Sequence, residues 1–123
     1  MKLVPVMLAF AVSLAVLGMP REGFSKDKDG FYMAFFAVSC RKYVVARRTH
    51  SDEEYEWWLA GYLTGLNNEL PNTFNLLGSS DDLSGPMLWL EDWCNKNPLK
   101  SMAEGAQAFV LELYPKRQQS RPK

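Results

Sequence analysis

Two cysteines and a single histidine are the first residues to consider for chemistry in this chain of 123 residues. Cys40, His50 and Cys94 would supply only three of the four ligands that a structural zinc ion takes, so we expect no metal site. In an oxidising compartment two cysteines are most simply one disulfide, Cys40–Cys94, because free thiols would react there. Closing a loop of this size should stabilise the fold by about 4 kcal/mol in the chain-entropy model.

The carboxylates form no catalytic arrangement. Glu91 and Asp92 are adjacent, and neighbours on a helix diverge by about 100°, so they cannot face one substrate as an acid–base pair. Asp81 and Asp82 lack the ligand spacing of a calcium loop. No glycine-rich phosphate loop and no nucleophile–base order occurs. The sequence therefore predicts a protein that is not an enzyme, with no catalytic residue and no cofactor.

Residues 1–18 have the pattern of a secretory signal peptide. Lys2 supplies a positive n-region, and an apolar run extends from Leu3 to Leu17. We place cleavage after Gly18, with Ser25 as a later alternative. An uncleaved membrane anchor is the competing interpretation, but a run of about 15 residues is short of the roughly 20 that a spanning helix needs. We expect export, with no stable membrane insertion after cleavage.

The balance of charges bears on the kind of partner. The formal net charge is +0, whereas a dedicated nucleic-acid binder needs a basic face to displace counterions. The sequence therefore predicts no nucleic-acid partner.

Four segments with helical periodicity should position the residues considered above. They are residues 31–48, 55–67, 86–95 and 97–114, the last beginning at Asn97 and Pro98 as N-cap and first-turn residues. The prediction is an all-α class, a single small four-helix domain over 31–115, with one disulfide joining the first helix to the third. A flexible lead-in (19–30) precedes the domain, and a basic, disordered tail (116–123) follows it.

The first segment is more apolar than a surface helix requires. Phe31, Tyr32 and Phe35 lie outside its apolar stripe, so they are either covered on other sides or form a contact surface. A basic cluster follows, which we expect at the C-terminal end of this helix, where cations complement the helix dipole. A phosphate or lipid-headgroup site is the alternative. The cluster comprises Arg41, Lys42, Arg47, Arg48 and His50.

The second segment should organise the core. Ser51 and Glu54 have the spacing of a capping box at its start. Gly61 and Gly65 lie one turn apart and cost about 1 kcal/mol each relative to alanine, so we expect another helix to approach closely there. Trp57 points to the opposite, polar face. The predicted core face comprises Tyr55, Trp58, Leu59, Tyr62, Leu63 and Leu66.

A long loop is predicted between the second and third segments. Turn-forming residues dominate 69–85 and no helical or strand period holds there. We expect Phe74, Leu76 and Leu77 to turn inward. A loop of this length in a small domain is often functional or mobile.

Three short motifs carry a resemblance to a known family. They are SCRKY at 39–43, WLAGYLTG at 58–65 and WCNKNP at 93–98. In this order, and with a closing alanine-bearing helix, they resemble the HdeA/HdeB family over residues 36–113. Members of that family are small exported helical proteins of Gram-negative bacteria with one disulfide.

The resemblance implies a periplasmic location and a stress-response chaperone that holds unfolding client proteins at low pH without ATP. It also implies a homodimer at neutral pH. Such a protein needs a fold that loosens when carboxylates are protonated. The candidate pH-responsive carboxylates are Asp52, Glu53, Glu54, Glu56, Glu91 and Asp92. The candidate partner contacts are Trp57, Phe31, Tyr32 and Phe35.

The alternative is a non-enzymatic interaction protein with one dedicated protein partner, either an immunity or inhibitor protein or an envelope assembly factor. Exported immunity proteins that plug cell-wall amidases are similar in outline. They carry a cysteine shortly before the Gly-Tyr pair, where this chain has Leu59. This alternative predicts a fold that persists at low pH, with Trp57 and the 69–85 loop as the contact.

Overall fold

The computed structural model describes residues 26–36 and 38–123. The predicted signal peptide (1–18) and the first part of the predicted lead-in (19–25) lie outside the described residues. The chain divides into two units, one ending at Met33 and the other comprising Ala34–Lys123. All helices within the described residues belong to the second unit.

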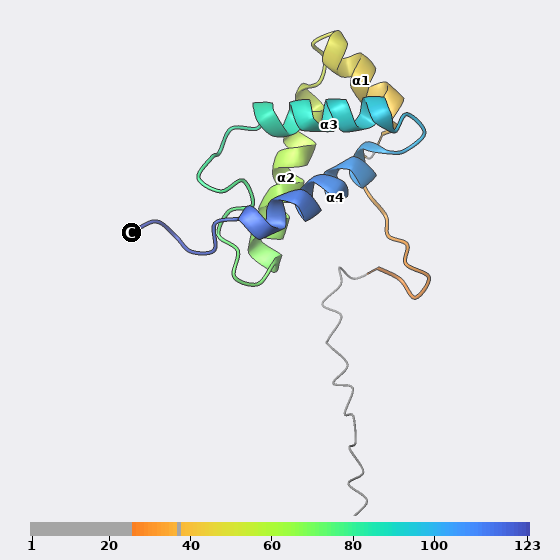
Figure 1. Ribbon diagram of the computed structural model, residues 1–123. Helices are drawn as coiled ribbons and strands as arrows, with labels where there is room; N and C mark the ends of the chain where they lie inside the picture. Colours follow the sequence, from red (N-terminus) through yellow and green to blue (C-terminus); the bar gives the residue numbers. More distant parts are fainter. Residues whose placement is uncertain (1–25, 37) are drawn as a thin grey trace, which may run out of the picture. The chain divides into compact units, whose positions relative to one another are not determined.

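Helices joined by loops make up the described part of the second unit (Figure 1). No strand occurs in the described ranges, and the predicted all-α class is confirmed. α3 packs against both α1 and α4. The elements are α1 (Cys40–Arg48), α2 (Glu53–Glu69), α3 (Ser84–Lys96), α4 (Met102–Leu113) and the 3₁₀ helix η1 (Tyr114–Lys116).

One junction joins α1, α3 and the start of α4. Cys40 and Cys94 form the predicted disulfide, with their Cα atoms 4.8 Å apart, and both residues are buried. The backbone N–H of Cys40 donates to the carbonyl of Lys100 at 2.9 Å, and that of Met102 donates to the carbonyl of Val38 at 2.8 Å. These bonds satisfy backbone groups that would otherwise be orphaned at two helix starts.

α2 supplies one wall of the core, as its periodicity predicts. Tyr55, Leu59, Leu63 and Leu66 are buried. A fully buried leucine contributes about 1.5–3 kcal/mol. Trp58 and Tyr62 are half-buried, and their rings stack with centroids 5.3 Å apart. The facing buried side chains come from the other helices and the loop: Tyr43, Leu76, Met87, Leu90, Met102, Ala106 and Val110.

The first helix is shorter than predicted. It begins at Cys40 rather than at residue 31, because the Ser39 side chain caps it by accepting from the N–H of Lys42 at 3.2 Å. Residues 31–36 are not helical. Arg41 and Lys42 therefore lie in the first turn of α1, and the prediction that they sit at its C-terminal end was wrong. It holds for Arg47 and Arg48, which occupy the last turn.

The caps of α2 and α4 also differ from the prediction. Asp52, not Ser51, is the N-cap of α2, and it makes no side-chain cap bond. The Ser51 hydroxyl instead pairs with that of Thr49 at 2.8 Å. The capping box occurs at α4, where Ser101 and Glu104 exchange hydrogen bonds.

The predicted start of the last helix at Asn97 was wrong, because Asn97 is the C-cap of α3. Its side-chain amide donates to the carbonyl of Trp93 at 2.8 Å, and this bond satisfies one of the free carbonyls at the helix end.

The chain beyond the last helix is not disordered throughout, contrary to the prediction for 116–123. Gln118 pairs with Asn75 in an antiparallel bridge. The guanidinium of Arg117 lies 3.8 Å from the ring centroid of Tyr114, and its Nε donates to the Thr73 hydroxyl at 2.9 Å. The tail is ordered to Gln118 because it supplies hydrogen-bond partners to the loop before α3.

That loop turns Leu76 into the core. The N–H of Leu76 donates to the side-chain oxygen of Asn67 at 2.9 Å, and the Leu76 side chain is buried. Leu77 is half-buried, but Phe74 is exposed. The inward prediction was therefore wrong for Phe74.

The close approach of helices occurs at a different glycine from those predicted. An added Cβ at Gly61 or Gly65 would meet nothing within 4 Å. At Gly105 on α4, a Cβ would lie 2.8 Å from the Trp93 ring and 2.9 Å from Leu90, both on α3. The α3–α4 interface therefore requires glycine at this position.

Two alanine substitutions test this assignment. We expect Gly105→Ala to lower the free energy of unfolding by about 1–3 kcal/mol, because it overpacks the interface. Gly61→Ala should raise it by up to about 1 kcal/mol, because it removes a helix-weakening glycine without a clash. Urea unfolding measures both. Equal effects of the two substitutions would contradict the assignment.

Candidate functional site

An arginine ties the start of α2 to α1 and α3. Arg47 on α1 contacts Asp52 at 2.6 Å through Nη1 and Glu91 at 3.0 Å through Nε. All three side chains are partly buried. Burial opposes the charge of Arg47, but the hydrogen bonds to Asp52 and Glu91 outweigh this and raise the pKa of Arg47 above its ordinary value. Of the six predicted pH-responsive carboxylates, these two share one partner.

A buried tyrosine, Tyr43, lies close to Arg47 on the same helix. The Tyr43 hydroxyl donates to the carbonyl of Met87 at 2.8 Å, and its ring meets that of Tyr55 edge-on with centroids 5.7 Å apart. Burial raises the pKa of Tyr43, against the opposing effect of Arg47. The tyrosine therefore stays neutral and holds α1, α2 and α3 together.

The other four predicted carboxylates are not brought together in one cluster. Glu53, Glu54 and Glu56 are exposed on the first turn of α2, and Asp92 is exposed on α3. No group of three or more metal-ligating His, Cys, Asp or Glu side chains occurs in the described part of the chain.

An open hollow of about 340 Å³ lies beside the start of α2. Its lining combines the ring of Trp57 with the carboxylates of Glu53 and Glu54, and a tryptophan face with nearby anions suits a cationic side chain of another protein. Trp57 is 70% exposed, in agreement with its predicted outward orientation. The lining residues are His50, Ser51, Glu53, Glu54 and Trp57.

Two further aromatic residues lie against the same half of α2. Phe35 is 82% exposed, and its carbonyl accepts from the indole N–H of Trp58 at 2.7 Å. The ring of Phe36 lies 5.8 Å from that of Tyr55, yet Phe36 is also largely exposed. Phe35 and Phe36 lie on the side of α2 that carries Tyr55 and Trp58, whereas Trp57 points to another side. We call these three exposed residues around the first two turns, Phe35, Phe36 and Trp57, the aromatic end of α2. Phe36 itself was not among the predicted contacts, because it fell on the stripe assigned to the core.

The remaining two predicted contacts belong to the other unit. Phe31 and Tyr32 are exposed, and the Lys26 ammonium lies 5.7 Å from the Tyr32 ring centroid. Their role as partner contacts stays a prediction.

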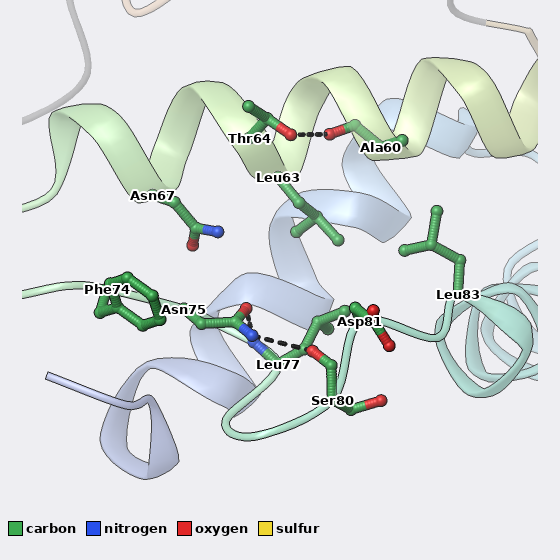
Figure 2. Close-up of a pocket in the computed structure, with 10 residues that line it drawn as sticks. All are labelled: Ala60, Leu63, Thr64, Asn67, Phe74, Asn75, Leu77, Ser80, Asp81 and Leu83. Carbon is green, nitrogen blue, oxygen red and sulfur yellow. Dashed lines mark hydrogen bonds between the residues drawn. The ribbon is translucent and has the colours of Figure 1, made fainter. Parts of the chain in front are cut away.

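A second hollow lies between α2 and the loop before α3 (Figure 2). It also measures about 340 Å³, and leucines from α2 and from the loop point into it beside polar loop residues. Asn75 orders the loop, since its amide donates to the Ser80 carbonyl at 2.8 Å and its side-chain oxygen accepts from Leu77 at 3.0 Å. The lining thus combines apolar side chains of α2 with polar side chains of the loop, among them Ser80 and Asp81.

Two carboxylates outside the predicted set have lowered pKa values. The N–H of Ser84 and then its hydroxyl lower the pKa of Asp82 below its ordinary 3.8. The N–H of Ser101, helped by Lys100, lowers the pKa of Glu104 below its ordinary 4.5. The Ser-x-x-Glu spacing at 101–104 is the sequence pattern of a capping box and indicates the role of Glu104. The prediction placed the helix start at Asn97 and Pro98 instead, so it missed this pattern.

No protein-family model matches the chain, and no curated protein or solved structure is significantly similar to it. In the described part of the chain, no helix is both long enough and apolar enough to cross a membrane.

The lowered pKa values predict a fold that weakens in acid. A carboxylate with a lowered pKa stabilises the fold fully above its ordinary pKa, and this contribution is lost as the pH falls through the lowered value. We expect the free energy of unfolding, measured in urea at pH 7, 5, 4 and 3, to fall mainly below about pH 4.5. Glu104→Gln should make that fall shallower, and Asp92→Asn, at an exposed carboxylate without an ion pair in the described residues, should not. An equally steep fall in the Glu104→Gln variant would contradict the assignment.

Proposed function

We propose that the protein is an exported chaperone of the HdeA/HdeB type, which holds unfolding client proteins in the periplasm during acid stress without ATP. The observation that carries the proposal is the aromatic end of α2. Phe35, Phe36 and Trp57 are all more than half exposed, and large exposed apolar groups on a small domain are typical of a protein-binding surface.

The backbone at Phe36 supports a role for this surface. Its φ is 60°, in the left-handed region, which costs a bulky residue about 1–2 kcal/mol. The Trp58 indole holds the turn by its bond to the Phe35 carbonyl. Residues held in such backbone conformations cluster at functional sites, so this one supports a binding role for the surface.

Carboxylates with lowered pKa values would make this fold respond to acid. The pKa values of Asp82 and Glu104 lie below their ordinary values, so their stabilising contribution is lost as the pH falls through the lowered values. A fold that loosens in this way would make more apolar surface available to a client.

The disulfide supports an oxidising compartment, though only weakly by itself. It also suits the proposed activity, because a covalent link between α1 and α3 limits unfolding of the chaperone at the pH at which its clients unfold.

The test is the aggregation of an acid-labile dehydrogenase at pH 2.5, followed by light scattering with and without the protein. We expect an equimolar amount to suppress at least half of the scattering. Phe35→Ser/Trp57→Ser should lose most of this effect, because it removes two exposed aromatic rings. Leu111→Ser, which removes an equally exposed apolar side chain from α4, should keep it. Equal aggregation with and without the protein would rule out the chaperone.

One observation favours a second candidate, an interaction protein with one dedicated partner. The loop before α3 is ordered by bonds to Asn67 and Gln118, so the hollow of Figure 2 is preformed, and preformed surfaces suit a single partner. This candidate predicts that one protein is recovered in stoichiometric amount from an envelope extract at neutral pH. Recovery of no reproducible partner would count against it.

A further inference from the structure

Two cations lie at the N-terminal end of α1, where the helix dipole is positive. Arg41 and Lys42 lie in its first turn, which carries no acidic residue. The N-terminus of a helix has a partial positive charge, so cations there destabilise the helix. Neither side chain has an ion-pair partner among the described residues. The fold therefore gives no reason for these charges.

The disulfide junction brings further exposed residues to the same place. Cys94 is bonded to Cys40, and Lys96 follows two residues later at the end of α3. The Lys100 carbonyl accepts from the N–H of Cys40, and between these lysines lies Leu99, which is 100% exposed. Figure 1 shows the start of α1 beside the end of α3 and the turn into α4. We call Arg41, Lys42, Lys96, Leu99 and Lys100 the basic rim.

The nearby anions leave the basic rim positive. Glu104 pairs with Lys100 at 3.2 Å, and Asp92 lies one turn before Lys96 on the exposed face of α3. The N-cap of α1 is an uncharged serine, Ser39. Set against these two carboxylates are four cations, and the positive end of α1 adds to them.

We propose that the basic rim docks on the anionic headgroups of a lipid bilayer, with Leu99 entering the interface. Lysine and arginine reach lipid phosphates with their charged ends while their aliphatic stems cover apolar surface. A fully exposed leucine at the tip of a turn gains free energy by leaving water at the interface. A nucleic-acid backbone offers no apolar site for Leu99, whereas a bilayer interface offers phosphates and apolar chains together over its whole surface, so the combination favours a membrane surface. This inference does not depend on the proposed chaperone activity.

The experiment is co-sedimentation of the oxidised protein with lipid vesicles at neutral pH and low salt. The protein is used with the N-terminus that the expressing cell leaves on it. The probes are vesicles of phosphatidylcholine alone and vesicles with one quarter phosphatidylglycerol. We expect binding to the anionic vesicles only, and loss of that binding when the salt is raised to about 0.5 M, because surface charges are then screened.

Matched variants locate the surface. Arg41→Gln/Lys42→Gln should weaken binding to anionic vesicles about 25-fold, at about fivefold for each cation. The control, Arg121→Gln/Lys123→Gln, removes two cations near the C-terminus and should change this binding less than about twofold. Leu99→Ser should weaken it by about tenfold or more. The first variant should also melt a few degrees higher, because it relieves the dipole conflict of α1. This rise separates lost binding from lost folding.

Three results would overturn the proposal. The first is no binding to anionic vesicles, or equal binding to both kinds. The second is an equal loss in the two double-glutamine variants. The third is capture of the protein by polyglutamate, in a manner that depends on Arg41 and Lys42, without binding to vesicles, since this would assign the basic rim to an acidic protein partner.

Discussion

The bond between Cys40 and Cys94 fixes the start of α1 against the end of α3, and the rest of the domain depends on this junction. The backbone bonds from Cys40 to Lys100 and from Met102 to Val38 attach the start of α4 to the same point. A domain of this size buries only a modest apolar core, and a loop closed over 54 residues contributes about 4 kcal/mol. That contribution is comparable to the net stability of a small protein.

At the other end of α1, charge takes the place of the covalent link. Arg47 forms ion pairs with Asp52, the residue before α2, and with Glu91 in the middle of α3. The hydroxyl of the buried Tyr43 donates to the Met87 carbonyl on α3. Ion pairs near the surface are weak and are screened by salt. The domain thus has one end held by a covalent bond and one end held by an ion-pair network, and the aromatic end of α2 lies at the second.

The core of α2, the disulfide and the all-α class were predictable because each depends on a local period or on residue type, as with Leu59, Leu63 and Cys40. The helix starts were not. At α4, Ser101 competes with another plausible cap, Asn97, and at α2 Asp52 competes with Ser51. At α4 the backbone bonds of the disulfide junction favour the later start. The error at α1 mattered for function, because it placed Arg41 and Lys42 at the helix end where their charge would have been explained. Arg47 meets Glu91 across 44 positions, and Gln118 meets Asn75 across 43. Such long-range pairs leave no pattern in a single sequence.

The most direct test of the proposed acid response is near-ultraviolet circular dichroism of the oxidised protein between pH 7 and pH 2. The account predicts that the aromatic signal of Tyr43, Tyr55 and Trp58 is lost below about pH 4, where carboxylates protonate. Much of the far-ultraviolet helical signal should remain, and the aromatic signal should return at pH 7. An aromatic signal unchanged at pH 2 would contradict the account and favour a permanent fold with a single dedicated partner.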